Sequence, residues 1–306
     1  MDWSPDGGEL AVGYADGTIV ILNDVGQIVR TLHVHTGIRI TMDWHPTENK
    51  IAIAAGGNIY VLDAQTGATL LFSPSDDSEG FLLRWSPNGE TLAVSGEAAG
   101  LNHAIYLLAP STGEISQSLY GPHAAALEAM EWSPDGTQIG SGDGDGLVVI
   151  WDTATGQPAV QFLETQTLGG DWVKSLAWSP DGTRIATAGD FQTVLVWDAA
   201  TGQRQFTVQP GHSVEDIAWS PDGTRIAGVQ QNALFVWDAL TGQEVGSISG
   251  IGSVSVVVWS PDGTQLVYGG SGGQVHFVPV PDSISDTPTP RPSVTQLPSP
   301  TMTPHQ

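Results

Sequence analysis

The amino-acid sequence predicts an all-β fold, a seven-bladed β-propeller of four-stranded antiparallel blades, and three features predict it. First, a Trp-Ser-Pro or Trp-His-Pro motif recurs at intervals of 41, 41, 47, 46, 41 and 40 residues, which indicates a repeat architecture. Its tryptophans are Trp3, Trp44, Trp85, Trp132, Trp178, Trp219 and Trp259. Second, each period contains short β-branched runs separated by Pro-Asp-Gly and Thr-Gly turns, as successive antiparallel strands do. Third, no segment keeps the periodicity of an amphipathic helix.

The fifth period shows the expected elements in chain order. An inner strand, 172–178, is followed by a turn in which Pro180 presets φ, Asp181 can bond its own backbone and Gly182 permits positive φ. A second strand (183–189), a third (193–198) and a fourth (204–208) follow, with an Ala-Ala-Thr-Gly-Gln turn between the last two. We name the four strands of a blade a to d, from the channel outward.

Blades 1 and 7 are expected to be incomplete where the ring closes. The first period begins at Met1-Asp2-Trp3, which leaves no room for an innermost strand, and the last stops after 274–280, before an outermost strand. One upstream segment of outer strand, loop and inner strand would fill both gaps, so we expect Met1 to be an internal start. A strand supplied by a partner and a ring that tolerates the gap are the alternatives.

Residues 1–280 are expected to form the propeller, and residues 281–306 an extended tail or linker. The tail is rich in Pro, Thr and Ser and has no aromatic residue, so it cannot bury enough apolar area to offset chain entropy. Thr-Pro tracts of this kind resemble the linkers of exported bacterial proteins. An extracytoplasmic location in a bacterium is therefore slightly favoured over a cytoplasmic linker toward a further domain.

Composition restricts the partners. The chain has 9 basic and 33 acidic residues, a formal net charge of −24, which disfavours nucleic acids and anionic membranes. It has no cysteine, which excludes disulfides, thiolate metal sites and thiol catalysis. No apolar run approaches the roughly 18 residues that a membrane helix needs. We expect a protein or peptide partner, no nucleic acid, no membrane insertion and a monomer.

The third strands 148–152, 194–198 and 234–238 end in Trp-Asp, and Gly211-His212 and the Gly-Pro-His of 121–123 stand where repeats begin. With the repeat period, these motifs resemble the WD40-repeat β-propeller family, in its bacterial form rich in Trp-Ser-Pro-Asp-Gly turns. The resemblance covers about residues 1–280, although the third strands of blades 1 to 3 and 7 lack the Trp-Asp pair.

The resemblance also implies a structural hydrogen-bonded tetrad of His, Ser or Thr, Asp and Trp. In blade 4 the matching residues are His123, Ser141, Asp145 and Trp151. The acidic glycine-rich stretch 142–146 is therefore expected to be scaffold. A calcium loop would need more widely spaced oxygen ligands and a later acidic residue. A phosphate loop would need a lysine and a following helix.

A propeller sorts its connections onto two faces: a–b and c–d turns on one, and d–a and b–c loops on the other, the top face. The first set is nearly identical between blades, whereas 73–80, 96–104 and 164–172 show that the second set varies. Variable loops on a rigid scaffold indicate recognition, and Trp172 lies outside the repeat positions that account for the other ten tryptophans. The expected partner-binding residues are Trp172, Lys174, Phe81, Glu128, Glu215, Arg39 and Phe191, with Asp16 as a weaker candidate.

The sequence favours a non-enzymatic binding or scaffolding propeller without cofactor, metal or catalytic residue. Ser271 fits a Gly-x-Ser-x-Gly pattern, but that pattern falls between two strands and not between a strand and a helix, as a nucleophile elbow requires. His33 and His35 lack a third metal ligand. Two alternatives stay open: a hydrolase or lyase with a metal-assisted site in the channel, and the sensory or regulatory portion of a larger bacterial protein.

Overall fold

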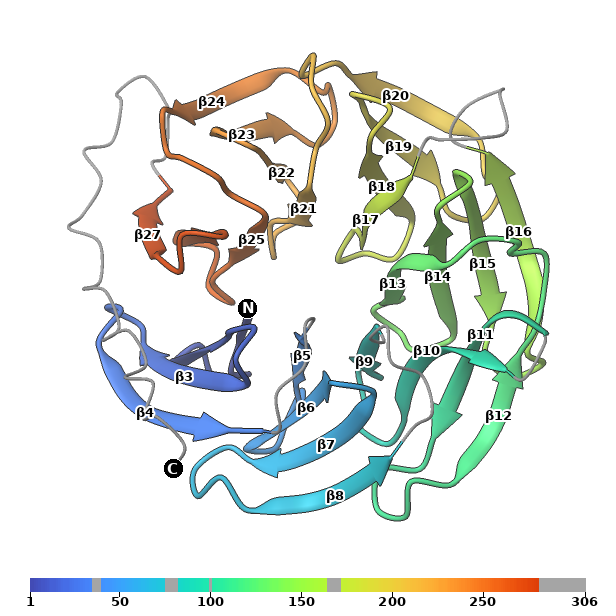
Figure 1. Cartoon of the computed structure of the whole chain (residues 1–306). Helices are drawn as coiled ribbons and strands as arrows, with labels where there is room; N and C mark the ends of the chain where they lie inside the picture. The colour runs from blue at the N-terminus through green and yellow to red at the C-terminus, as the bar shows by residue number, and fades with distance from the viewer. Residues whose placement is uncertain (35–39, 75–81, 99–100, 164–171, 281–306) are drawn as a thin grey trace, which may run out of the picture.

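The computed structural model of the chain describes residues 1–34, 40–74, 82–98, 101–163 and 172–280. In this part of the chain all regular structure is β, and 27 strands form seven separate antiparallel sheets around a central opening (Figure 1). Six sheets have four strands and the seventh has three, and strands adjacent in sequence are adjacent in each sheet. The predicted seven-bladed propeller is confirmed.

The strands occupy equivalent places in each blade. Strands a line the channel: β1 (Asp2–Trp3), β5 (Ile40–Trp44), β9 (Leu83–Trp85), β13 (Leu127–Trp132), β17 (Val173–Trp178), β21 (Asp216–Trp219) and β25 (Val256–Trp259). Strands b are β2 (Glu9–Gly13), β6 (Lys50–Ala55), β10 (Leu92–Ala98), β14 (Gln138–Asp143), β18 (Arg184–Gly189), β22 (Arg225–Gln230) and β26 (Gln265–Gly269). Strands c are β3 (Thr18–Asn23), β7 (Asn58–Asp63), β11 (Leu101–Leu108), β15 (Leu147–Asp152), β19 (Val194–Asp198), β23 (Ala233–Asp238) and β27 (Val275–Pro279). Strands d are β4 (Ile28–His33), β8 (Thr69–Pro74), β12 (Ile115–Leu119), β16 (Gln157–Leu163), β20 (Arg204–Val208) and β24 (Glu244–Ser249).

The a–b turn of each blade is built by its own residues. In blade 5 the Gly182 N–H donates to the Ser179 carbonyl at 2.8 Å, and Gly182 has φ +70°. The Asp181 carboxylate accepts bonds from the Ser179 hydroxyl at 2.6 Å and the Thr183 N–H at 3.0 Å. These bonds lower the pKa of Asp181 to about 2. The turn thus positions strands a and b through local contacts.

The hydrophobic core lies between neighbouring blades. Between blades 5 and 6, Val196 and Ala188 pack in one cluster with Trp219 and Ile226. Aliphatic side chains on strands b and c are buried against the next blade in the same manner around the ring. This packing sets the rigid channel and the two faces.

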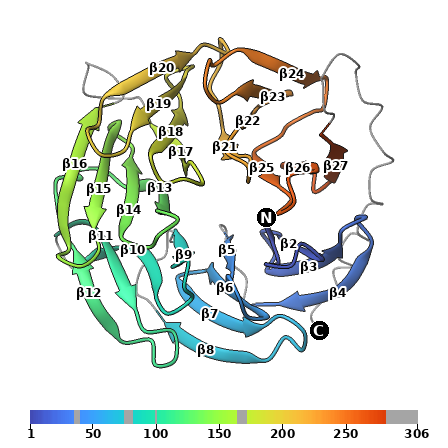
Figure 2. The same ribbon diagram turned by 180° about the vertical axis from the view of Figure 1, so that it is seen from behind.

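The ring closes where blade 7 packs against blade 1. β1 forms a two-residue strand, so the expectation that blade 1 has no room for an inner strand is corrected in this detail. Blade 7 has three strands within the described ranges. Trp3 and Phe277 pack across the seam with ring centroids 6.1 Å apart. The N-terminus lies beside the central opening (Figures 1 and 2).

Within the described ranges, no helix is long and apolar enough to cross a membrane. The expected tail, residues 281–306, lies outside those ranges.

Candidate functional site

A buried polar cluster in blade 4 accounts for the glycine-rich acidic stretch. The indole N–H of Trp151 donates to the hydroxyl oxygen of Ser141 at 2.7 Å. The same hydroxyl lies 2.7 Å from Nε2 of His123, and Nδ1 of His123 lies 2.8 Å from a carboxylate oxygen of Asp143. Because the hydroxyl accepts from Trp151, its hydrogen can point to His123, whose other nitrogen donates to Asp143.

The acidic member of this cluster is Asp143 and not Asp145, which corrects the sequence-based assignment. Ser141 and Asp143 are two positions apart on β14, so their side chains point to the same face of the strand. Asp145 lies at the tip of the following turn, where its N–H donates to Oδ1 of Asp143 at 3.0 Å. The period-two spacing from Ser141 was the signal that could have identified Asp143.

Ser, His and Asp side chains in this order also occur in hydrolase triads. Here His123 and Ser141 are 0% exposed and Asp143 is 1% exposed, so a substrate has no access to the hydroxyl. The arrangement ties strands b and c of blade 4 to the segment that enters it. Within the described residues, blade 5 keeps the bond from Trp197 to Thr187, at 2.8 Å.

The sequence motif at blade 6 does not build such a cluster. His212 is exposed, and Gly228 stands at the place of Ser141. A Cβ on Gly228 would lie 2.6 Å from the Trp237 ring, so the indole occupies the space of the missing side chain. Ser271 lies in the turn between β26 and β27, as the hairpin interpretation expects, and His35 is outside the described residues.

The central channel has a volume of about 750 Å³ and two unlike halves. The residue before each motif tryptophan lines it: Asp2, Asp43, Arg84, Glu131, Ala177, Ala218 and Val258. Blades 1 to 4 therefore contribute charged groups at this level, and blades 5 to 7 contribute apolar ones. The sequence analysis did not identify this division, although the aligned positions contain it.

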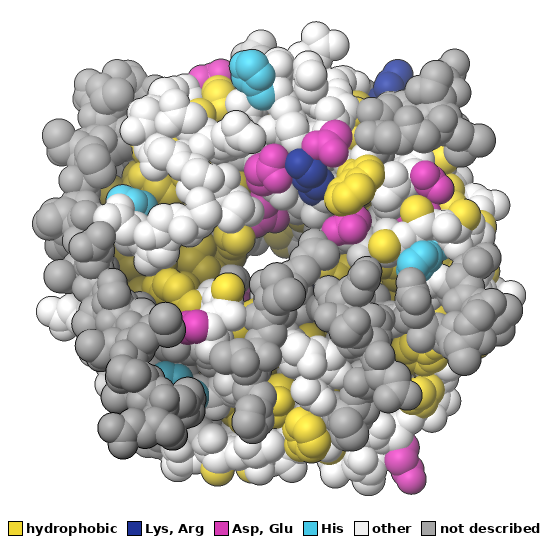
Figure 3. Space-filling model, in the orientation of Figure 1, with side chains coloured by type: hydrophobic (Ala, Val, Ile, Leu, Met, Phe, Trp, Pro, Cys, Tyr) yellow, Lys and Arg dark blue, Asp and Glu magenta, His cyan; other side chains and the backbone are white. Residues whose placement is uncertain are grey.

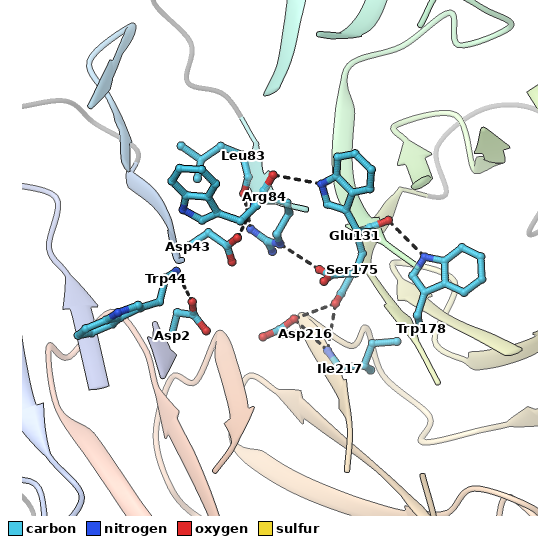
Figure 4. Close-up of polar contacts among 12 residues, drawn as sticks. Asp2, Asp43, Trp44, Leu83, Arg84, Glu131, Ser175, Trp178, Asp216 and Ile217 are labelled. Carbon is cyan, nitrogen blue, oxygen red and sulfur yellow. Dashed lines mark hydrogen bonds and ion pairs between the residues drawn. The ribbon is translucent and has the colours of Figure 1, made fainter. Parts of the chain in front are cut away.

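The channel carboxylates connect adjacent blades (Figure 4). Asp2 accepts the backbone N–H of Trp44 at 2.5 Å, and Asp43 accepts that of Trp85 at 2.5 Å. Arg84 pairs with Glu131 at 2.9 Å. In the other half, Asp216 accepts bonds from the Ser175 hydroxyl at 2.8 Å and the Val257 N–H at 2.9 Å.

Burial changes the titration of these carboxylates. It raises the pKa of Asp2 to about 6 and raises the pKa of Asp216. Burial, together with the negative charge of Asp2, raises the pKa of Asp43 well above its ordinary value. Among the side chains that the structure describes, no three His, Asp or Glu residues come together in a way that could hold a metal ion.

Trp172 is the exposed tryptophan of the top face. Its side chain is 47% exposed, whereas each of the other ten tryptophans is at most 8% exposed. The edge of its indole lies over the b–c turn of blade 4, because Nε1 and Cδ1 are 3.7 and 3.9 Å from the position a Cβ would take on Gly144. Its carbonyl accepts the N–H of Asp190 at 3.2 Å.

Lys174 is held by acidic groups of two blades. Its ammonium lies 2.7 Å from Asp190 of its own blade and 3.0 Å from Glu215 of blade 6, and it bonds the Ser213 hydroxyl at 3.2 Å. Burial lowers the pKa of Lys174, but its bonds to Asp190 and Glu215 outweigh this and raise it. Figure 3 shows acidic side chains around a basic one beside the channel opening.

Some of the other residues expected on the top face lie in the described part of the chain, and others lie outside it. Phe191 is half-buried in the b–c turn of blade 5, and a Cβ on Gly189 would lie 2.8 Å from its ring. Glu128 is half-buried on β13. The structure thus brings Trp172, Lys174, Phe191 and Glu215 into one region, whereas Arg39 and Phe81 lie outside the described residues.

Comparison with known proteins identifies repeats of one family in three segments of the chain. The family model described as "WD domain, G-beta repeat" matches residues 113–152, 162–198 and 202–238. The first match covers strand d of blade 3 and strands a to c of blade 4, and the other two are offset in the same way. The three matches end at the three Trp-Asp pairs.

Three relatives are similar to parts of this chain. Echinoderm microtubule-associated protein-like 4 of Xenopus laevis is 31% identical over 118 residues, 37% of this chain and 12% of that protein. WD repeat-containing protein AAC3 of Dictyostelium discoideum is 25% identical over 157 residues, 50% of this chain and 32% of that protein. Intraflagellar transport protein 80 homolog of Rattus norvegicus is 29% identical over 150 residues, 48% of this chain and 18% of that protein.

These relatives are eukaryotic, so the bacterial subtype expected from the turn motifs stays a prediction. The chain spans 12% to 32% of the relatives' own lengths. The ring of seven sheets is a β-propeller, and three of its segments match the model of the WD repeat family.

Proposed function

We propose that this propeller is a non-enzymatic interaction scaffold that binds a partner protein or peptide on its top face, around the channel mouth. The exposure of Trp172 carries the proposal. Ten tryptophans are buried in the scaffold, and the eleventh is half-exposed at the rim. Aromatic side chains at such positions bury a large area on binding and dominate interface energies.

The comparisons support a binding role. By name, one relative is a microtubule-associated protein, so similar repeats occur in a protein that is named for an association. The net charge of −24 favours a protein partner over a nucleic acid. Loops 75–81 and 164–171 belong to the expected surface but are outside the described residues.

The test compares two exposed hydrophobic residues on opposite faces. Leu240, which is 80% exposed, lies in the c–d turn of blade 6 and is the matched control for Trp172. A partner recovered from native extract and then purified should bind the wild type and Leu240→Ala equally. It should bind Trp172→Ala about tenfold or more weakly, measured by calorimetry. Equal affinity for Trp172→Ala, or loss only with Leu240→Ala, would contradict the proposed face.

A further inference from the structure

We infer that the partner presents a cationic side chain, arginine or lysine, to a rim site formed by Trp172, Phe191, Asp145 and Asp190. This inference rests on the proposed function, because it names the chemistry of the partner for the same face. It is carried by the aromatic groups, the local charge and an unusual turn, which are independent features of blades 4 to 6.

The rim site places the backbone of Trp172 and the ring of Phe191 beside one glycine. The Trp172 carbonyl and the Phe191 ring both lie against Gly189, where a Cβ would be 1.7 Å from that carbonyl and 2.8 Å from that ring. The indole extends from there to Gly144, directly before Asp145. Asp190 adjoins Trp172 through the bond from its N–H to the Trp172 carbonyl. An exposed indole in a region that also carries Asp145 and Asp190 favours a cation, because the face of an aromatic ring and carboxylates both attract positive charge.

The charge of the rim site disfavours an anionic group as its ligand. Lys174 is the basic residue of this region, and its ammonium is already paired with Asp190 and Glu215. Its charge is thus more than matched by these two carboxylates, and Asp145 adds another. A phosphorylated or acidic segment would meet net repulsion here, whereas a basic segment would be attracted by the rim and by the chain's overall charge of −24.

The turn that carries Phe191 has an uncommon backbone. Gln192 has φ +60° and is the non-glycine residue of the described chain with positive φ. Gly17, Gly146 and Gly273 hold the equivalent place in blades 1, 4 and 7, with φ of 86°, 81° and 68°. A glutamine costs more than glycine in this conformation, and such outliers cluster at binding sites. Blade 5 therefore departs from the common turn at the point where an aromatic ring replaces the Asp16, Asp145 or Gly272 of other blades.

The experiment uses two five-residue peptides, blocked at both ends, that differ in charge alone: Gly-Ser-Arg-Ser-Gly and the same peptide with citrulline in place of arginine. Binding is followed on the whole chain by the indole N–H resonance of Trp172, and by the backbone N–H of Gly144 in variants without that indole. The arginine peptide should shift Trp172 saturably, and the citrulline peptide should bind about tenfold more weakly. Added salt should weaken the binding of the arginine peptide and leave the binding of the citrulline peptide unchanged.

Two variants separate a cation site from a merely apolar one. Trp172→Leu keeps an apolar side chain without the aromatic ring. It should lower the affinity for the arginine peptide about tenfold. Asp145→Asn should weaken it about two- to threefold, since the lost carboxylate is partly exposed. Unchanged affinity in Trp172→Leu would mean that the indole contributes only area, and it would overturn the inference.

The outcomes also separate this inference from the proposed function. If neither peptide shifts Trp172, or if both bind equally, the cation inference is wrong. If in that case the purified protein partner still loses affinity with Trp172→Ala, the top face remains the binding face for a different chemistry. If partner affinity is independent of Trp172 and the peptides do not bind, both proposals fail.

Discussion

At the scale of single residues, His123 shows how a buried polar group is tolerated in blade 4. Both of its ring nitrogens have partners, Ser141 and Asp143, and Asp143 accepts further bonds from the backbone N–H groups of Asp145 and Leu147. Each buried polar atom is therefore compensated, which is the condition for such a network to stabilise a fold. The two aspartates of this hairpin differ in burial although they stand two positions apart.

Replacing these aspartates in turn should separate scaffold from surface. Asp143→Asn removes the carboxylate charge and one acceptor from a fully buried network, so it should lower the free energy of unfolding by about 3 kcal/mol. Asp145→Asn should change it by less than about 0.5 kcal/mol, because that side chain is partly exposed. Urea denaturation of the three proteins measures both values. A larger loss from Asp145→Asn would restore the sequence-based tetrad.

At the scale of elements, the blades are connected in two ways around the channel. In blades 4 to 7, the motif tryptophan donates its indole N–H to a carbonyl of the blade before it. The bonds run from Trp132, Trp178, Trp219 and Trp259 to Arg84, Glu131, Ala177 and Ala218, at 3.1 to 3.2 Å. Between blades 1, 2 and 3, where Asp2 and Asp43 take the backbone N–H of the next tryptophan, the indoles have no such bond within the described chain.

The packing between blades should be sensitive to one added methyl group. A Cβ on Gly142 of β14 would lie 2.4 Å from a methyl carbon and 2.7 Å from the Cβ of Val173 in the next blade. Gly142→Ala should therefore lower the free energy of unfolding by about 1–3 kcal/mol. Gly272→Ala is the matched control, since nothing lies within 4 Å of its Cβ position and its φ is not in the left-handed region.

Thermal denaturation of the two glycine variants measures this difference. Gly272→Ala should remain close to the wild type. Equal melting temperatures for the two variants would show that the blade 4–5 contact can relax, contrary to the tight packing of Val173 against β14.

At the scale of the whole molecule, acidic groups act on stability in opposite directions. The surface turns stabilise ionised carboxylates, as in Asp181, whose pKa is lowered to about 2 by its bonds to Ser179 and Thr183. The channel disfavours ionised carboxylates, as in Asp2, whose pKa burial raises to about 6. The ionised carboxylate is thus stabilised in the turn at Asp181 and destabilised in the channel at Asp2.

The pH dependence of stability follows from these two shifts. The Asp2 contribution is present below its unfolded value of 3.8 and is lost as pH rises through about 6, because the folded state binds the proton more tightly. The Asp181 contribution is present above 3.8 and is lost as pH falls through about 2. Unfolding free energy should therefore be greater near about pH 4.5 than near about pH 7.5.

Asp2→Asn tests how much of this pH dependence of the unfolding free energy comes from the channel residue Asp2. The variant should reduce the fall in unfolding free energy between those pH values, by up to about 2 kcal/mol, since the amide does not titrate. Urea denaturation across the pH range provides the measurement. An identical slope in wild type and variant would show that Asp2 titrates normally in the folded protein.

Much of the fold could be predicted because its signals are local. The Ser-Pro-Asp-Gly turns position strands through bonds within five residues, as in Ser179 to Arg184, and the alternation of each strand is visible in the same short window. The candidate site was partly predictable for the same reason: Trp172 stands outside the repeat pattern. Asp143 was missed because the count from Trp151 ignored which face of β14 each residue occupies.

By itself, the sequence determined the number of blades and the order of their strands. Tertiary structure alone decided which side chains of different blades meet. Lys174 reaches Glu215 across 41 positions, and Asp43 reaches the Trp85 N–H across 42. Such contacts depend on the distance and angle between packed sheets, which no local pattern encodes. For that reason the contacts across the channel and the aromatic, acidic rim at Trp172 emerged only when the blades were assembled.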